Sequence, residues 1–592
     1  MAPLTTFPIV GSPFNGRIKF LQDFAIPDLD NGSDCEDHEG VGWSRRSWIE
    51  KFRFGHAPSI EMLNTLTFPL VALAVGLGIS LLTTPFARWV AIRFGLVDYP
   101  DNHRKLHKEP IALCGGLSVL FSMLISVILA LVVFPELTNH LYKDSYQAIS
   151  LGIGSIAIVG LGLLDDRFGL RGRQKLAGQI LICLSIIAFG FSITSVQIFG
   201  YSIELGLIAW PATLVWLLLC INSINLIDGA DGLCSSVGWI AFAAVSAISA
   251  YTGNTVEAII AGAMAGALLG FLFFNLPPAK VFLGDSGSML VGLILGVLTM
   301  RSWFTNTSSM SLTTPLVLMS IPLFDSSMAI LRRKLTGRSV FTVDRGHLHH
   351  NLMRHGIRNR ALVGVITLLS MITAGGAVAG VLLRSDLISL ATTIFAIGTL
   401  VVSRLFGFAE LELLGKKIWT FLSSLIIHQG TADQSAMQQV VKLQGNRNWE
   451  TVWHTLVEFC EKHNLARVSL DLNMPWLHEG FHADWHRSKM PEYSERWSVK
   501  LPLIHSGKVY GRLEFIGRHR DGETLVVMAQ LTELLETMQV DIENMVDDFA
   551  LEKTPKRVEE PSGTPSGIES NFQLPQSNPN SIPVPSTRSA PA

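Results

Sequence analysis

Five clusters of acidic, amide and histidine residues interrupt an otherwise apolar chain. They are the pair Asp165 and Asp166, the run 222–232, the stretch 282–287, Asp325, and the trio His347, His349 and His350. Each cluster lies at or near the end of a hydrophobic segment. Carboxylates at such places are costly and usually mark functional sites. These clusters are therefore the candidates for chemistry.

The run 222–232 carries four polar side chains at intervals of three residues. Neighbouring members of such a series share one face of a helix. The glycines at 229 and 232 then allow the backbone to leave the helix and approach a ligand. Simple capping is the alternative interpretation, but two amides and two carboxylates exceed what a cap needs. The four residues are Asn222, Asn225, Asp228 and Asp231.

Three further carboxylates have the features of a cation site. Asp165 and Asp166 close a segment, and because adjacent helical residues point about 100° apart, one can face a metal while the other meets a base or a cation. The helix dipole disfavours them there, so Mg²⁺ or Arg167 is expected as an offset; a solvated surface pair is the alternative. Asp285 begins a later segment, where amide groups can bind phosphate and a carboxylate can bind a hard cation.

The remaining two clusters lie on either side of a basic exit from the membrane. Burying Asp325 unpaired would cost on the order of 3 kcal/mol, so we expect a cationic or polar partner. His347, His349 and His350 lie in the most basic loop. A three-histidine zinc site is one interpretation. The neighbouring Arg and Lys residues would repel a metal, however, and favour an anionic, phosphorylated substrate.

Apolar segments long enough to cross a bilayer must position these clusters. The chain has 592 residues, of which 48% are hydrophobic and 16% charged, so a membrane protein is expected rather than a soluble enzyme. Six cysteines without a CxxC pair indicate neither a disulfide framework nor a thiolate metal site. Eleven segments have a suitable length: 67–90, 112–134, 148–164, 177–196, 205–221, 236–251, 256–274, 288–303, 311–331, 362–383 and 387–404.

The distribution of Lys and Arg orients these segments. The loops after the first, third, fifth, seventh and ninth segments carry seventeen basic residues, and the intervening loops carry three. Basic loops stay in the cytoplasm, so all five clusters and the carboxyl end are predicted to be cytoplasmic and the amino end to be outside. Four basic residues between 45 and 53 oppose that orientation. We therefore hypothesise that the natural start is Met62.

The predicted fold is an all-α polytopic membrane protein with about eleven transmembrane helices, followed by a small α+β soluble module and a disordered tail. Amphipathic spacing after the last segment predicts an interfacial helix over 405–427, and alternation over 467–472, 497–504 and 509–516 predicts strands. The module's element order loosely resembles a GAF-type sensor domain, with a structural or partner-binding role favoured over ligand sensing. The predicted parts are an amino-terminal extension of unknown role (1–61), a transmembrane catalytic domain (62–404), the interfacial helix and linker (405–444), the cytoplasmic module (445–550) and a Pro- and Ser-rich tail (551–592).

Over about 67–404 the chain resembles the polyprenyl-phosphate N-acetylhexosamine-1-phosphate transferases, of the glycosyltransferase family 4 type. The resemblance rests on four ordered motifs: GLLDDRFGLRGRQKLAGQ, NSINLIDGADGL, FNLPPAKVFLGDSGSMLVG and FDSSMAILRRKLTGRSVFTVDRGHLHH. The ending DRGHLHHNL is similar to the undecaprenyl-phosphate N-acetylglucosamine-1-phosphate transferases, whereas the I-H-H-H-F-E type loop of the phospho-muramoyl-pentapeptide branch is absent. One departure is the family's proline shortly before Gly115-Gly116, where this chain has Ile111-Ala112-Leu113-Cys114.

The resemblance implies transfer of N-acetylglucosamine-1-phosphate from UDP-N-acetylglucosamine to undecaprenyl phosphate, giving a lipid-linked sugar pyrophosphate and UMP. Such a reaction is the first step of a cell-envelope polysaccharide pathway, such as lipopolysaccharide biosynthesis, at the cytoplasmic face of the inner membrane. Mg²⁺ is the implied cofactor, with Mn²⁺ as the alternative. Another UDP-N-acetylhexosamine or phospho-MurNAc-pentapeptide is the alternative donor. Membrane lipids and a second copy in a homodimer are the other expected partners, and nucleic acid is not.

The resemblance also implies roles for individual residues. Asp285 and Asp165 are the implied metal ligands, and the implied catalytic carboxylates are Asp165, Asp166, Asp228 and Asp231. Asn225, Asp228 and Asp231 would hold the nucleotide side, Phe282 would stack on uracil, and Arg171 and Lys175 would meet phosphate. The full set of implied substrate-binding residues is Asn222, Asn225, Phe282, Arg171, Lys175, Arg345, His347, His349 and His350.

The chemistry of the acceptor limits the need for a general base. A phosphate monoester has a second pKa near 6, so it is mostly dianionic at pH 7 and gains little from deprotonation. Mg²⁺ should contribute more, by neutralising pyrophosphate oxygens. We therefore predict a single displacement, with Asp165 positioning as much as accepting a proton. A transporter with a carboxylate relay is the competing class, but relay residues would line a path across the bilayer, whereas these gather at one face.

Overall fold

The computed structural model describes most of the chain after residue 59. The described ranges are 60–98, 110–135, 145–198, 201–301, 312–336, 346–426, 436–444, 449–474, 479–487, 490–505, 508–519 and 523–552. Predictions for nearly all of the extension 1–61, for Arg345 and for the tail after residue 552 lie outside these ranges.

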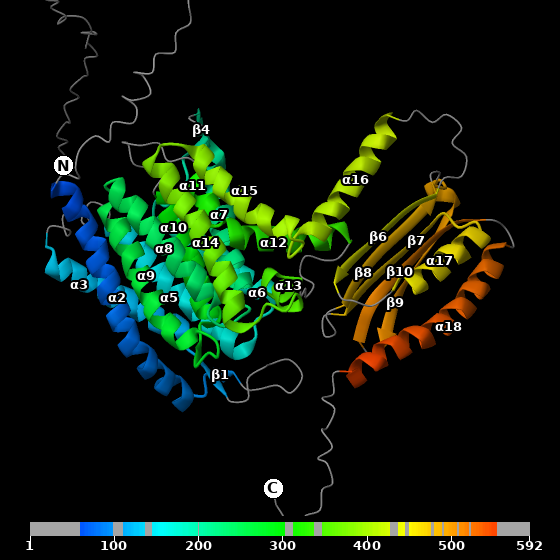
Figure 1. Cartoon of the computed structure of the whole chain (residues 1–592), viewed down its shortest axis with the longest axis horizontal. Coiled ribbons are helices and arrows are strands. Elements are labelled where there is room, and N and C mark those ends of the chain that lie inside the picture. Colours follow the sequence, from blue (N-terminus) through cyan, green and yellow to red (C-terminus); the bar gives the residue numbers. More distant parts are fainter. Residues whose placement is uncertain are drawn as a thin grey trace, which may run out of the picture. The chain divides into compact units, whose positions relative to one another are not determined.

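Every predicted apolar segment contains a helix of the helical body in Figure 1. In chain order these helices are α2 (Ile60–Arg93), α3 (Gly115–Val133), α5 (Ser145–Phe168), α6 (Gly172–Ala188), α7 (Ala209–Ile227), α8 (Leu233–Tyr251), α9 (Thr255–Asn275), α10 (Gly284–Arg301), α11 (Thr313–Leu318), α12 (Ser320–Leu335), α14 (Asn359–Leu382) and α15 (Asp386–Val402). The short helix α13 (Leu348–Arg354) lies between α12 and α14.

Seven helices of the described part are long and apolar enough to cross a membrane, namely α2, α3, α5, α7, α8, α9 and α14, while α10 and α15 are shorter apolar helices. The protein is therefore an integral membrane protein of largely helical fold. The count of about eleven spans stays a prediction.

Two predicted segments are not single helices. The segment 177–196 leaves its helix after Ala188, where Gly190 adopts a φ of +100°, a conformation that ends helices. Its last residues begin a hairpin of β3 (Ser195–Ile198) and β4 (Tyr201–Glu204), followed by the 3₁₀ turn η1 (Gly206–Ile208). The segment 311–331 is divided after Leu318, because Pro322 has no N–H to donate to the carbonyl four residues earlier.

Helix α10 lies in the centre of the helical body, where it packs against α3, α5 and α7. Its side chains from Met289 to Leu295 are buried. Glycines permit close approach at its amino-terminal end: a Cβ at Gly116 of α3 or at Gly162 of α5 would overlap the backbone of residues 285–287. The first turn of α10, which carries Asp285, is thus fixed by two neighbouring helices.

A small sheet fixes the chain just before α10. β2 (Ile111–Leu113) pairs in parallel with β5 (Val281–Phe282) and antiparallel with β1 (Val97–Asp98). The segment that departs from the family's proline pattern therefore forms β2. Gly116 adds a backbone hydrogen bond to the carbonyl oxygen of Leu283 at 3.1 Å, so the sheet sets where α10 begins.

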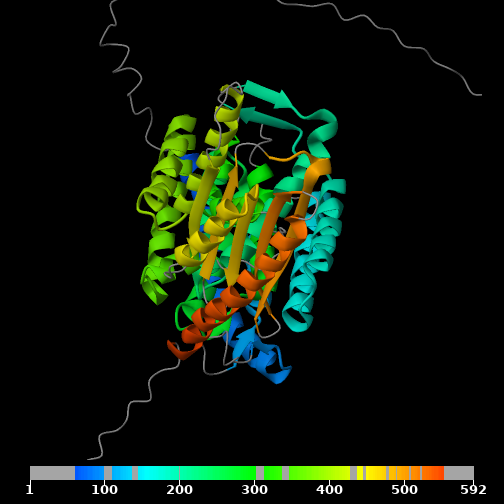
Figure 2. The same cartoon turned by 90° about the vertical axis from the view of Figure 1, so that its right-hand side faces the viewer.

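Helix α16 (Phe408–Ile426) occupies the range predicted for an interfacial helix. A five-stranded antiparallel sheet of order β6-β8-β7-β10-β9 follows, and the strands predicted over 497–504 and 509–516 are present in it as the antiparallel pair β9 and β10. Figure 2 shows α17 and α18 on one face of this sheet, where Trp453, Leu470 and Leu531 are buried together. The elements are β6 (Ala436–Gln444), α17 (Glu450–Lys462), β7 (Arg467–Met474), β8 (Glu479–Arg487), η2 (Tyr493–Glu495), β9 (Arg496–His505), β10 (Lys508–Arg518) and α18 (Glu523–Glu552).

The boundary predicted at residue 445 is wrong, because β6 belongs to the sheet and lies in the predicted linker. Its sequence AMQQVVKLQ lacks a regular alternation of apolar and polar residues, so the pattern gave no strand signal. The preceding α16 does lie within its predicted range.

Candidate active site

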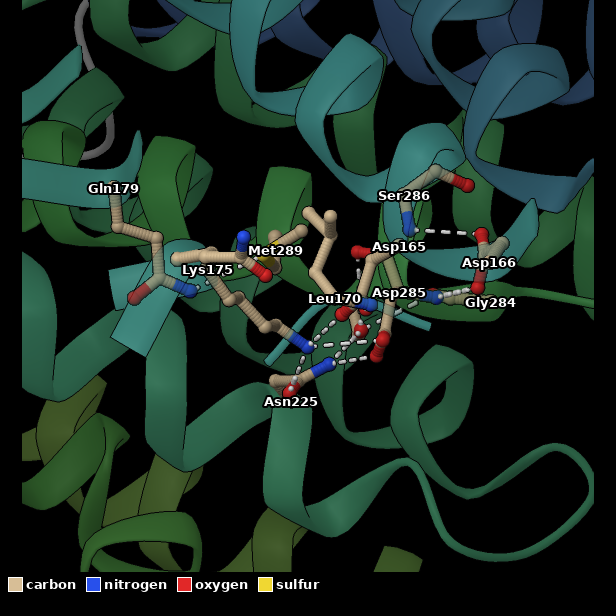
Figure 3. A network of polar contacts seen from close by, with 12 residues as sticks. Asp165, Asp166, Leu170, Lys175, Gln179, Asn225, Gly284, Asp285, Ser286 and Met289 are labelled. Atoms are coloured by element: carbon tan, nitrogen blue, oxygen red, sulfur yellow. Dashed lines mark hydrogen bonds and ion pairs between the residues drawn. The ribbon is translucent and has the colours of Figure 1, made fainter. Parts of the chain in front are cut away.

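Three oxygen atoms from three helices converge on the ammonium group of Lys175. Lys175 Nζ lies 2.9 Å from Asp165 Oδ2 and 2.9 Å from Asp285 Oδ2, and it donates to Asn225 Oδ1 at 3.1 Å. Figure 3 shows the four side chains pointing toward one another. Asp165 comes from the end of α5, Lys175 from the first turns of α6, Asn225 from the end of α7 and Asp285 from the start of α10. We name Asp165, Asn225 and Asp285 the oxygen cluster.

Asp166 has a contact of a different kind. Its Oδ1 accepts a hydrogen bond from the backbone N–H of Asp285 at 2.9 Å, and its Oδ2 accepts one from Ser286 at 3.3 Å (Figure 3). These are amides of the first turn of α10, where helix N–H groups have no partner within the helix. Gly284 adopts a φ of +74°, and a Cβ there would lie 2.7 Å from Asp166 Oδ2. Asp166 therefore caps α10 and holds Asp285 in place, while its predicted catalytic role stays a prediction.

The two amide side chains of the run 222–232 have different contacts, because Asn225 belongs to the oxygen cluster and Asn222 does not. Asn225 donates to Asp285 Oδ1 at 2.5 Å and to Ser288 Oγ at 2.8 Å. Asn222 instead donates to Gln179 Oε1 at 2.9 Å and to the carbonyl oxygen of Leu218 at 2.8 Å. Asn222 was predicted to bind substrate, yet one of these bonds joins it to α6 and the other to the preceding turn of its own helix. Its position three residues earlier turns it away from the oxygen cluster.

The carboxylates after α7 also differ in their surroundings. Asp231 Oδ2 accepts the backbone N–H of Ala279 at 3.0 Å, which ties the loop after α7 to the loop before β5. Within the described ranges, the Asp228 carboxylate makes no hydrogen bond. Burial, and then repulsion from Asp285 and Asp166, raise the pKa of Asp228 well above its ordinary value. Asp228 is thus an acidic side chain close to Asp285 and Asp166 whose oxygens have no hydrogen-bond partner in the described ranges.

The segment that carries His347, His349 and His350, which we name the histidine segment, lies against the same loop after α7. His347 Nδ1 lies 3.2 Å from Asp325 Oδ2, and the backbone N–H of Leu348 donates to Asp325 Oδ1 at 2.8 Å. The expected polar partner of Asp325 is therefore the start of α13. The ring of His349 lies against Gly229, where a Cβ would overlap it. Burial, and then the neighbouring His350, lower the pKa of His349 to about 3, so this imidazole is neutral at physiological pH.

The oxygen cluster has the donor set of a Mg²⁺ site, since Mg²⁺ prefers carboxylate and amide oxygens. The three oxygens already surround one positive charge, that of Lys175. The three histidines gather differently: the rings of His347 and His349 have centroids 6.1 Å apart, and those of His349 and His350 4.2 Å apart. Across the described ranges, no three His, Cys, Asp or Glu side chains form a metal-binding group.

Other predicted substrate residues lie around the cluster. Phe282 is half-buried in β5, directly before the turn that carries Asp285. Arg171 is exposed at the start of α6, and its backbone N–H donates to Gln174 Oε1 at 3.1 Å. His350 is half-buried at the end of the trio. Their predicted roles toward substrate stay predictions.

Two polar residues that fix the site were not predicted. Gln179 is fully buried one turn after Lys175 and binds Asn222 and the sulfur of Met289. Asn275 accepts hydrogen bonds from Gly232 N at 3.1 Å and Ser235 Oγ at 2.8 Å, and it donates to the Val281 carbonyl oxygen at 2.9 Å. The available signals were an amide within an apolar segment for Gln179 and an amide at the end of one for Asn275.

Known proteins share the region that holds this site. The model of glycosyl transferase family 4 matches residues 148–303. A Bacillus subtilis protein named "Probable undecaprenyl-phosphate N-acetylglucosaminyl 1-phosphate transferase" is 31% identical over 305 residues, which are 51% of this chain and 82% of that protein. A Mycolicibacterium smegmatis decaprenyl-phosphate N-acetylglucosaminephosphotransferase is 35% identical over 337 residues, covering 52% and 82%. The Escherichia coli undecaprenyl-phosphate alpha-N-acetylglucosaminyl 1-phosphate transferase is 32% identical over 296 residues, covering 49% and 77%.

The family-model match runs from within α5 to the end of α10 and therefore includes the whole oxygen cluster. Three of the four motifs from which the family was expected lie within that match, and the fourth, which begins at Phe324, follows it. The predicted class of enzyme is thereby confirmed as a sugar-phosphate transferase. The chain belongs to glycosyl transferase family 4.

Proposed function

We propose that this enzyme transfers N-acetylglucosamine-1-phosphate from UDP-N-acetylglucosamine to undecaprenyl phosphate. The relatives named above are transferases of N-acetylglucosamine phosphate that act on polyprenyl phosphates. The observation that carries the proposal is the convergence of Asp165, Asn225 and Asp285 on one cation position at the end of membrane helices. A cation there would meet the phosphates of a lipid head group and a nucleotide sugar.

The reaction needs no net proton transfer. An oxygen of the dianionic lipid phosphate attacks the phosphorus that bears the sugar, and the bond from that phosphorus to the bridging oxygen breaks. A new pyrophosphate linkage forms, and UMP leaves as a dianion. Because the acceptor is already deprotonated at pH 7, the task of the site is to hold like-charged groups together and to stabilise the leaving phosphate.

The residues divide this task by their charge and contacts. Asp285, Asp165 and Asn225 would hold Mg²⁺, which supplies charge neutralisation for the pyrophosphate. Lys175 provides a second positive charge at the same place. Asp166 keeps Asp285 at the helix start. The neutral imidazole of His349 packs on the loop of Asp228, so the histidine segment closes the side of the site toward the donor.

The site faces the cytoplasm in this proposal. The seventeen-to-three distribution of basic residues supports that orientation, and nucleotide sugars are cytoplasmic substrates. We accordingly place the enzyme in the inner membrane, at the first step of a cell-envelope polysaccharide pathway.

A direct assay tests the function. The full-length protein in detergent is mixed with undecaprenyl phosphate and one radiolabelled UDP-sugar at a time, either N-acetylglucosamine or N-acetylgalactosamine, with MgCl₂ or with EDTA. We expect UMP and a labelled lipid only when UDP-N-acetylglucosamine is the donor and MgCl₂ is present. Preference for the galactose epimer would reject the proposed donor, and full activity in EDTA would reject the metal.

A further inference from the structure

Helix α12 holds the first turn of the histidine segment by two charged side chains. Asp325 Oδ1 accepts the N–H of Leu348 at 2.8 Å, and Arg332 Nη2 donates to the carbonyl oxygen of Gly346 at 2.9 Å. The two residues are seven positions, or two helical turns, apart, so they share one face of α12. Between them they fix the backbone on both sides of His347.

The charge of Arg332 is buried and requires a partner. Its side chain is only 1% exposed, and a buried guanidinium without a counter-charge is strongly unfavourable. Glu410 of α16 supplies the carboxylate: Arg332 Nε donates to Glu410 Oε1 at 2.7 Å, and Nη2 also contacts that oxygen. The Glu410 side chain is 6% exposed. One guanidinium therefore joins α16 to the residue before His347.

Two other residues on the same face of α16 support this contact. Leu413 is fully buried and packs against Leu335 at the end of α12. Lys417 Nζ donates to the carbonyl oxygen of Leu335 at 2.6 Å. Glu412, in contrast, pairs with Lys416 at 2.7 Å on the exposed side, where both side chains are more than 40% exposed. Position 412 thus offers a matched control on the same helix.

We propose that Glu410 is a positioning residue for the histidine segment, acting through Arg332 on Gly346. Glu410 lies on α16, outside the residues 148–303 matched by the family model. The catalytic consequence rests on the proposed function, in which the histidine segment lies toward the donor. The structural consequence does not: the carboxylate fixes the direction of the guanidinium, and the guanidinium fixes the Gly346 carbonyl.

Glu410→Gln and Glu412→Gln separate this role from a general effect on α16. Both remove one negative charge without changing side-chain size, but only the first removes the carboxylate that contacts Arg332. In full-length protein in detergent, we expect Glu410→Gln to accelerate hydrogen–deuterium exchange across residues 346–354 and to lower kcat/KM for UDP-N-acetylglucosamine about tenfold to hundredfold, as for misplaced substrate contacts. Glu412→Gln should leave both unchanged. Unchanged exchange in Glu410→Gln would overturn the proposal.

A charge exchange distinguishes positioning from simple attachment of α16. The double variant Arg332→Glu, Glu410→Arg keeps opposite charges between α12 and α16 but presents no donor to the Gly346 carbonyl. We expect its thermal stability to exceed that of Arg332→Glu alone, while exchange at 346–354 stays fast and activity stays low. If the double variant recovers activity, Glu410 serves only to attach α16 to α12. The two proposals can also fail separately. If the unaltered protein is inactive with every UDP-sugar, the proposed function is rejected. If Glu410→Gln still accelerates hydrogen–deuterium exchange at 346–354 in that case, the positioning role of Glu410 remains supported.

Discussion

Replacing Lys175 by methionine should make the stability of the protein depend on Mg²⁺. The variant removes the ammonium group that lies 2.9 Å from both Asp165 and Asp285 and leaves two carboxylates facing each other. Removing one partner of a buried ion pair costs about 3–5 kcal/mol. The side chains here are 16%, 9% and 33% exposed, so solvent screens part of the loss, and we expect about 2 kcal/mol in the absence of metal.

Mg²⁺ should then replace the missing charge. A ligand present at 100 times its Kd stabilises the folded protein by about 2.7 kcal/mol, enough to offset the loss. Thermal unfolding of both proteins in detergent, with EDTA or with MgCl₂, measures the difference. We expect a larger rise in Tm with MgCl₂ for Lys175→Met than for the unaltered protein. Arg173→Met, which removes an exposed cation from the same helix, is the control and should respond like the unaltered protein. Equal responses of Lys175→Met and the control would refute a cation position shared by Lys175 and metal.

Three further predictions concern the surroundings of the oxygen cluster. Asp166→Ala should lower stability by about 1–2 kcal/mol through loss of the α10 cap, measured by thermal unfolding, and an unchanged Tm would contradict the capping role. Gly229→Ala should raise KM for the UDP-sugar, because its Cβ would overlap the His349 ring; steady-state kinetics with unchanged KM would argue against contact between that loop and the donor. Below pH 6, kcat/KM for undecaprenyl phosphate should fall about tenfold per pH unit as the acceptor gains a proton, since His349, with a pKa of about 3, stays neutral there. A flat profile between pH 5 and 6 would refute dianionic attack.

Much of the site follows from the sequence because helix ends are marked by polar residues. The apolar segments located Asp165, Asn225 and Asp285 at helix termini, and the Lys and Arg distribution predicted that they lie on one side of the membrane. The structure brings them within contact of one ammonium group although they span 120 positions. Membrane helices are long and regular, so position along the chain converts directly into depth.

The different contacts of neighbouring residues could not be predicted from the sequence in this way. Asp165 and Asp166 are adjacent and chemically identical, yet one faces Lys175 and the other caps α10. Which of them does so depends on how α5 is rotated against α10, and close contact at Gly162 sets that rotation. Asn222 turned inward for a similar reason, since Gln179 lies opposite it. Side-chain direction at a helix end is a tertiary property.

Side-chain contacts between residues distant in the sequence could not be predicted from the sequence either. Asp325 called for a polar partner, but its binding to the start of α13 depends on the fold of the connection after α12. The pair of Arg332 and Glu410 joins residues 78 positions apart, with two intervening apolar helices. Strand β6 lacked a clear alternation and forms because the neighbouring β8 supplies its hydrogen bonds.

The most direct test of the central claim is product formation by Asp285→Asn. The account places Asp285 at the cation position, held there by Asp166, Asn225 and Lys175. With undecaprenyl phosphate, radiolabelled UDP-N-acetylglucosamine and MgCl₂, we predict a labelled lipid from the unaltered protein and at least about a hundredfold lower rate from the variant, as expected for loss of electrostatic stabilisation. Asp285→Asn acting at the unaltered rate would contradict the account.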